Sequence, residues 1–454
     1  MSRAAAGALA LLLVPAVATA RDIRHQTLQE QIDAAPAGAR LDVAPGEYDG
    51  DLVIRRAIHL VGVGRPLLLG DGDGSVVTIL AADVIVEGFT IDGRKGGDLG
   101  KDASGILVAA PRATIRNCIV RNTLFGIYLK QAPGSRIEQC RIQGIKEKAA
   151  GEKGSGIHVW NTDGFTLLQN EIVDVRDGIY IQSSPHGSSR GNVARNLRYG
   201  LHYMYSDDNT FEDNVFENGD AGTALMYSRR LTFRRNQFLH NRGFASVGLL
   251  FKTCDEILAE DNLIADNARG IFLEGSTGNV FRGNAIVGSD IAIVLFDSTA
   301  TTTFSGNSFV GNLSPLSLVG RHTDTVFTGN YWSANTVPDL DGDGRSDAPY
   351  RLSSLFDHFR SNLTAADLFS RSLSADALAA AEQALPVLDP VDVVDGSPLA
   401  KPPALRVPMP WRNPERKREP VGLAASAALL AAGALTLIAS RPRRAQTRVA
   451  EVSA

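Results

Sequence analysis

Gly178-Ile-Tyr-Ile and, one period later, Gly200-Leu-His-Tyr-Met belong to a pattern that runs through residues 105–295. In this pattern a glycine is followed by alternating apolar residues, and the steps between glycines are 21, 30, 22, 22, 22, 26 and 22 residues. The glycines are Gly105, Gly126, Gly156, Gly178, Gly200, Gly222, Gly248 and Gly270. A fixed period of this length indicates a solenoid, and short alternations broken by Gly, Asn and Asp indicate strands. The sequence therefore predicts an all-β parallel β-helix with about 22 residues per rung.

Side chains on successive rungs of such a fold form columns, because rungs lie about 4.8 Å apart and alternate side chains point in and out. Counting from each glycine, we expect the first and third residues to fill the interior and the second and fourth to face outward. The second-position column reads Tyr128, His158, Tyr180, His202, Ala224, Leu250, Phe272, and the fourth-position column reads Lys130, Trp160, Gln182, Met204, Met226, Lys252, Glu274. An outer face rich in aromatic, histidine and methionine side chains is typical of a binding surface.

Asparagines keep the same period and are expected at a corner of each rung, where Asn tolerates the left-handed conformation and bonds to stacked neighbours. They are Asn170, Asn192, Asn214, Asn236, Asn262, Asn284, Asn307 and Asn330. Cys118 and Cys140 lie 22 residues apart. They either neighbour each other on adjacent rungs or are separated because Cys140 takes the corner asparagine position. Three cysteines do not make a disulfide framework, so buried free thiols are favoured.

The segments outside the repeats indicate export and membrane attachment. Residues 1–20 resemble a secretory signal peptide, with Ala18-Thr-Ala as its cleavage site. The β-helix domain is expected over 21–350, with an amphipathic N-terminal cap at Leu28–Ala35, followed by a helical and proline-rich extension over 351–420. Uncharged residues 421–440 predict a transmembrane helix, with a surface or partner helix as the alternative, and 441–454 predict a basic cytoplasmic tail.

The spacing of four aspartates indicates a metal-binding loop, and the net charge argues against nucleic-acid binding. The formal net charge of −4 gives no nucleic-acid footprint. Asp339, Asp341, Asp343 and Asp347 follow the first part of a calcium loop, although Tyr350 stands where a glutamate is expected. A structural Ca²⁺ that caps the last rung is one interpretation, and an Asx-rich turn without metal is the other.

The outer columns contain a candidate copper site. Met204 and Met226 fall on adjacent rungs, His202 precedes Met204 by two residues, about 6.8 Å along the strand, and His158 lies in the same strip. Thioether and imidazole ligands suit Cu(I), and an incomplete ligand set suits transfer of the metal rather than storage. The alternative is a hydrophobic docking patch for another protein.

A second class of function is polysaccharide chemistry, which parallel β-helices often perform as lyases or C5-epimerases. That chemistry needs an acid and a base within reach of one sugar. Asp207 and Asp208 are the best candidates, with Arg229, Arg230 or His202 as helpers. No convincing acid–base pair is evident among them.

Several motifs together resemble the NosD family, periplasmic maturation proteins of nitrous oxide reductase. They are His202-Tyr-Met-Tyr-Ser, Ala224-Leu-Met-Tyr-Ser-Arg-Arg, Gly248-Leu-Leu-Phe-Lys, Asn267-Ala-Arg-Gly-Ile-Phe-Leu-Glu-Gly, Gly329-Asn-Tyr-Trp-Ser with Asp341-Gly-Asp-Gly, and Leu385-Pro-Val-Leu. The resemblance covers residues 25–410 approximately and implies a right-handed β-helix that is not an enzyme. It also implies partnership with an ABC ATPase and permease, a copper donor lipoprotein, and delivery of copper to nitrous oxide reductase. Together with the predicted span, it places the protein in the periplasm, anchored to the inner membrane.

Overall fold

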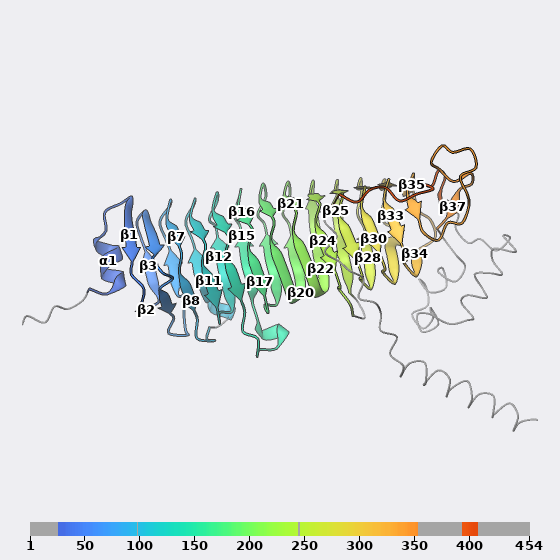
Figure 1. Ribbon diagram of the computed structural model, residues 1–454. Coiled ribbons are helices and arrows are strands. Elements are labelled where there is room, and N and C mark those ends of the chain that lie inside the picture. The colour runs from blue at the N-terminus through green and yellow to red at the C-terminus, as the bar shows by residue number, and fades with distance from the viewer. Residues whose placement is uncertain (1–25, 98, 244–245, 353–392, 407–454) are drawn as a thin grey trace, which may run out of the picture. The chain divides into compact units, whose positions relative to one another are not determined.

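The computed structural model describes residues 26–97, 99–243, 246–352 and 393–406 (Figure 1). Within them the chain is an all-β parallel solenoid of the right-handed type, with about 13 turns of about 22 residues, as the period predicts. The predicted signal peptide, residues 353–392 and 407–420 of the predicted extension, the predicted span 421–440 and the predicted tail 441–454 lie outside these residues. No helix in the described part is long and apolar enough to cross a membrane.

Each turn contributes three strands, which stack into three faces. Face A is β1 Ala39–Val43, β4 Ile58–Gly62, β7 Ile85–Glu87, β10 Thr114–Arg116, β13 Arg136–Glu138, β16 Thr166–Leu168, β19 Ser188–Arg190, β21 Thr210–Glu212, β23 Thr232–Arg234, β26 Leu258–Glu260, β29 Val280–Arg282, β32 Thr303–Ser305 and β35 Val326–Thr328. Face B is β2 Glu47–Asp49, β5 Leu67–Leu69, β8 Thr90–Asp92, β11 Ile119–Arg121, β14 Arg141–Gln143, β17 Glu171–Val173, the first parts of β20 Val193–Met204 and β22 Val215–Arg229, β24 Gln237–Leu239, β27 Leu263–Ala265, β30 Ala285–Val287, β33 Ser308–Val310 and β36 Tyr331–Trp332. Face C is β3 Leu52–Ile54, β6 Val77–Ile79, β9 Ser104–Val108, β12 Phe125–Lys130, β15 Ser155–Trp160, β18 Asp177–Gln182, the last parts of β20 and β22, β25 Val247–Asp255, β28 Arg269–Glu274, β31 Ile291–Phe296 and β34 Ser314–Val319.

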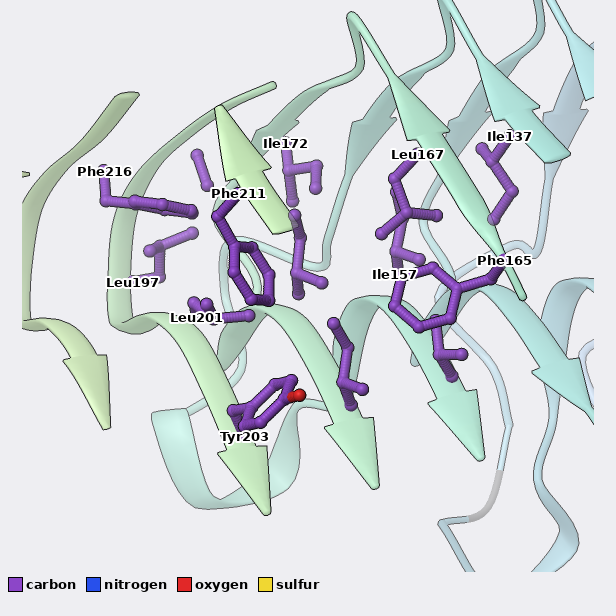
Figure 2. Close-up of a cluster of buried hydrophobic side chains, with 14 of the residues drawn as sticks. Ile137, Ile157, Phe165, Leu167, Ile172, Leu197, Leu201, Tyr203, Phe211 and Phe216 are labelled. Atoms are coloured by element: carbon purple, nitrogen blue, oxygen red, sulfur yellow. The ribbon is translucent and has the colours of Figure 1, made fainter. Parts of the chain in front are cut away.

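The interior is a continuous apolar column, and the predicted inward positions fill it. Ile157 and Val159, the first and third residues after Gly156, are fully buried, as are their equivalents on neighbouring rungs. Figure 2 shows how side chains from different strands, among them Leu201, Tyr203 and Phe211, meet in this core. Aromatic rings also stack from rung to rung; the Phe211 and Phe233 ring centroids are 4.7 Å apart.

The recurring glycine lies at the corner between faces B and C, where the chain of one rung approaches the next. A Cβ built on Gly178 would lie 2.6 Å from the carbonyl oxygen of Gly200. A larger residue at Gly178 would crowd the backbone of the next rung, which accounts for the glycine at this position.

The asparagine series forms a buried ladder of hydrogen bonds at the corner between faces A and B. Asn214 is typical: its Oδ1 accepts from the backbone N–H of Asn192 at 3.0 Å, and its Nδ2 donates to the Oδ1 of Asn236 at 2.9 Å. Bonding to stacked neighbours is confirmed, but the left-handed conformation predicted for the asparagines is wrong. The preceding residue adopts it instead, as Asp213 does with φ 55°, which turns the asparagine side chain inward.

Cys118 and Cys140 are free, buried thiols, as favoured from the sequence. Both occupy asparagine-ladder positions: the Cys140 Sγ donates to the carbonyl of Ile115 and the Cys118 Sγ to that of Val86. Cys140 therefore takes the corner position without being separated from Cys118. A hydrogen bond between the two thiols lowers the pKa of Cys118 and raises that of Cys140.

Both ends of the stack are covered (Figure 1). At one end helix α1 (Leu28–Ala34) buries Leu28 and Ile32, and the Gln29 side chain bonds to the backbone N–H and C=O of Val53 on the edge strand β3. At the other end β37 (Tyr350–Arg351) and β38 (Val394–Asp395) extend face A. Covering the open edges of the solenoid blocks edge-to-edge association.

Candidate functional site

The two methionines of the predicted copper site lie side by side on face C. Met204 and Met226 are in register on β20 and β22. Both are half-buried, whereas the alternate residues Tyr203 and Leu225 are fully buried in the core. The two thioethers therefore belong to the outer surface of the solenoid, on adjacent rungs, as the column pattern predicts.

The methionine pair has a tyrosine hydroxyl on one side and a lysine ammonium group on the other. The Tyr180 hydroxyl lies 3.9 Å from the Met204 sulfur and donates to the Gln182 side chain at 2.7 Å. One rung beyond Met226, Lys252 is held by Glu274 at 2.9 Å. This ion pair raises the pKa of Lys252, so a cation ends the methionine column on that side.

The second-position column forms a ladder of rings in contact from rung to rung beside the methionines, which we call the aromatic ladder: Tyr128, His158, Tyr180 and His202. Successive centroids are 4.4, 4.4 and 4.9 Å apart. Burial lowers the pKa of His158 to about 4, so its ring is neutral at neutral pH. Its Nδ1 has no hydrogen-bond partner among the described residues. His158 is two rungs from His202, with the Tyr180 ring between them, so it is not brought together with the methionines.

A buried carboxylate that the sequence pattern does not reveal holds the last ring of the ladder. Asp177, with no exposed surface, lies 3.2 Å from the Nδ1 of His202, and Arg198 forks it at 3.0 and 2.9 Å. Arg176 is a second cation in contact with this carboxylate, at 3.2 Å. Burial raises the pKa of Asp177, but the His202 hydrogen bond and the charge of Arg198 outweigh it, and the net pKa is lowered.

Asp177 also decides which nitrogen of His202 is free. Because the ionised carboxylate accepts a hydrogen bond from Nδ1, the neutral ring carries its proton there and presents Nε2 as the lone-pair nitrogen. The pairing turns Nδ1 toward the start of the neighbouring strand, where Asp177 lies. The signal for this residue is its place directly before Gly178 of the repeat, at a position where a charged side chain is uncommon.

The candidate sugar-active carboxylates are paired with arginines on the adjacent rung. Asp207 accepts from the backbone and the Nε of Arg229, both at 3.0 Å, and Asp208 is forked by Arg230 at 2.7 and 2.8 Å. Arg230 lowers the pKa of Asp208, which keeps that carboxylate ionised and unfit as a general acid. Both carboxylates are thus engaged in ion pairs between adjacent rungs.

The predicted calcium loop brings three of its four carboxylates together. Asp339, Asp341 and Asp343 each offer an oxygen, and these atoms lie within 4.8 Å of one another. Asp347 instead accepts from the backbone N–H of Leu340 at 2.9 Å. Hard oxygen ligands at this spacing suit Ca²⁺. The loop is exposed, and Asx-turn hydrogen bonds, such as Asp339 Oδ1 with the N–H of Gly342, also run through it.

The fold and this surface define a class of protein: a parallel β-solenoid that presents thioether and imidazole side chains on one outer face. Residues 142–337, which include the methionine pair, match a family model described as "Periplasmic copper-binding protein (NosD)". This region of the chain is NosD-like, and the resemblance indicated by the motifs is confirmed there.

Curated relatives carry the same family name. The chain is 32% identical over 179 residues to the "Probable ABC transporter binding protein NosD" of Pseudomonas aeruginosa, covering 38% of this chain and 40% of the relative. It is 31% identical over 179 residues to the protein of that name from Stutzerimonas stutzeri, covering 39% and 40%. The matched region thus covers about 40% of the length of each of these relatives.

Among solved structures, the A-module of mannuronan C-5 epimerase AlgE6 from Azotobacter vinelandii superimposes with a TM-score of 0.53. It covers 66% of this chain and 92% of that module at 16% identity. This likeness establishes the β-helix architecture alone, since function resides in sites that differ between proteins of one fold.

Proposed function

We propose that this protein is the periplasmic β-solenoid component of an ABC-transporter system that delivers Cu(I) for the metal centres of nitrous oxide reductase. The observation that carries the proposal is the in-register pair of outward thioethers, Met204 and Met226, on adjacent rungs of face C. Sulfur ligands of this kind select Cu(I) over harder cations. The description of the matching family model, which refers to copper binding, and the names of the relatives, which refer to an ABC transporter, support the same direction.

In this proposal Cu(I) is cargo, held by the two thioethers and by the Nε2 of His202. Asp177 accepts a hydrogen bond from Nδ1 of His202, which leaves Nε2 of the neutral ring as the ligand atom. Two thioethers and one imidazole leave the ion open to a fourth ligand from a partner. Such a site favours exchange by ligand replacement over storage.

The remaining parts of the system follow from the family resemblance. A donor lipoprotein supplies the copper, the ATPase and permease change which partner can reach face C, and the reductase receives the ion. Two further parts rest on the sequence itself and not on the resemblance: residues 1–20 direct export to the periplasm, and 421–440 anchor the chain in the inner membrane with its basic tail in the cytoplasm. The Asp339–Asp343 loop binds Ca²⁺ and rigidifies the last turn.

The test is Cu(I) binding to the purified exported chain under reducing conditions, in competition with a chromophoric Cu(I) chelator. The double variant Met204→Leu with Met226→Leu keeps the apolar volume and removes both sulfurs, and we expect it to lose one equivalent of bound Cu(I). Gln182→Ala, in the same outer column, is the matched control and should keep it. Equal stoichiometry in the double variant and the wild type would remove the site.

The polysaccharide alternative is separated in the same preparation. Incubation with polyuronates should give no unsaturated ends and no change in uronate stereochemistry. Turnover that disappears in Asp207→Asn or Asp208→Asn would favour the enzyme over the copper carrier.

A further inference from the structure

A pocket of about 570 Å³ lies at the corner between faces C and A, next to the methionine pair and outside the proposed metal site. Its lining comes from four successive rungs and consists of Ser183, Pro185, Tyr205, Asp207, Tyr227, Ser228, Arg229, Thr253 and Asp255. The volume falls in the range of ordinary ligand pockets, about 300–1,000 Å³. It combines two aromatic rings with charged groups.

Two exposed tyrosines form the apolar part of this pocket. The rings of Tyr205 and Tyr227 are stacked, with centroids 5.1 Å apart and planes inclined by 9°. They are 56% and 45% exposed, which makes them unusual among the large apolar side chains of this chain. Exposed aromatic residues beside a pocket are typical of recognition sites.

The backbone at this corner presents both rings at the surface. Tyr205 and Tyr227 adopt the left-handed conformation, with φ 51° and 54°, and so do Ser183 and Thr253 at the same corner of the flanking rungs. Because the flanking side chains are small, the stack ends after two rings. Within the described residues, neither ring has an arginine or lysine over its free face.

The acidic group of the pocket is Asp255. Its Oδ1 accepts from the backbone N–H of Thr277 at 2.8 Å, and it forms no ion pair among the described residues. Asp207, in contrast, is already paired with Arg229 at 3.0 Å. The pocket therefore joins an exposed pair of tyrosine rings to a carboxylate that has capacity for a cation.

The same combination occurs elsewhere in this chain, where an arginine occupies it. The guanidinium of Arg198 lies over the ring of Tyr199, 4.3 Å from its centroid, and forks the carboxylate of Asp177. Cation–π contact and a forked carboxylate both favour the planar guanidinium over a lysine ammonium.

We propose that this corner pocket recognises an arginine side chain of a partner protein, which stacks on the Tyr205–Tyr227 pair and pairs with Asp255. The pocket is larger than one side chain, so residues flanking the arginine also fit within it. This recognition is independent of copper. Because Tyr205 and Tyr227 directly follow Met204 and Met226, a partner seated here would lie beside the thioethers; that consequence alone rests on the proposed copper function.

The experiment uses copper-free exported chain with ¹³C-labelled tyrosine rings and N-acetyl-arginine methylamide as the probe. We expect NMR shifts in the resonances of two tyrosines, assigned with Tyr205→Phe and Tyr227→Phe. The lysine analogue should bind about threefold more weakly, because it lacks the planar stack. Asp255→Asn should weaken arginine binding about tenfold, the loss expected for one charge-assisted pair.

The control is Asp324→Asn, because Asp324 accepts a similar backbone hydrogen bond, from Thr301, outside this pocket. It should leave arginine binding unchanged. Equal binding of the arginine and lysine probes, equal affinity in Asp255→Asn and the wild type, or tighter binding of a mannuronate trisaccharide than of arginine would each overturn the proposal. Failure of copper binding in the methionine variants would leave these results untouched, which keeps the two proposals separable.

Discussion

Replacing one amide of the buried ladder should destabilise the solenoid far more than any change on its outer faces. Asn214 has no exposed surface, and Asn214→Ala removes the acceptor of the Asn192 backbone N–H. It also removes donors to the carbonyl of Ser189 and to Asn236. A buried N–H left without a partner costs about 1–3 kcal/mol, and each further lost hydrogen bond about 0.5–1.5 kcal/mol. We therefore expect a loss of about 4 kcal/mol in the free energy of unfolding.

The measurement is urea denaturation followed by circular dichroism, combined with hydrogen exchange of the peptide that contains Asn192. Stacked repeats are stabilised mainly by nearest neighbours, so exchange should accelerate most on the rungs of Asn192 and Asn236. Thr210→Ala is the matched control, because Thr210 is a half-buried outward residue of β21 on the same rung, and it should cost less than about 1 kcal/mol. Equal urea midpoints for the two variants would refute the reasoning that the ladder is a principal source of stability.

Three further outcomes are expected. Burial holds the pKa of His158 at about 4, whereas its imidazole in the unfolded chain is protonated near pH 6.5. The free energy of unfolding should therefore fall by about 3 kcal/mol as the pH drops from 6.5 to 4. Urea midpoints at pH 7 and 4.5 check this, and His158→Phe should reduce the difference between the two midpoints. Millimolar CaCl₂ should raise the thermal midpoint of the wild type but not of Asp341→Asn, measured by calorimetry, and an equal rise in both would contradict the calcium loop. Cys118 and Cys140 should resist maleimide in the native protein and react fully after unfolding, counted by mass spectrometry; a disulfide-linked peptide would contradict the free thiols.

The amino-acid sequence by itself determined which side chains lie one rung apart and which of them are buried. A period of 22 residues fixes which side chains lie one rung apart, so the pairing of Met204 with Met226 followed from counting. The burial of Ile157 and Val159 followed from the alternation of a strand for the same reason. The hydrogen bonds between successive asparagines followed from their common spacing.

The backbone conformation at the corners is decided locally, and the spacing of the repeat did not predict it. The left-handed residue precedes each asparagine, as Asp213 precedes Asn214, because the asparagine side chain must point inward to reach the next rung. Spacing alone locates a corner to within one or two residues and does not say which of them carries the turn.

Only the tertiary structure decided the groups that do not repeat. Asp177 gathers Arg176, Arg198 and His202 around one buried carboxylate, and the spacing of the repeat does not show which groups meet there. Asp395 ends the asparagine ladder by accepting from the N–H of Asn330 at 2.9 Å, although 65 residues separate them. The physical reason is that each rung of a regular stack fixes the register of the next. Which buried charges are neutralised at the corners, and which distant strand covers the open end, depends instead on the surfaces that remain after the stack has formed.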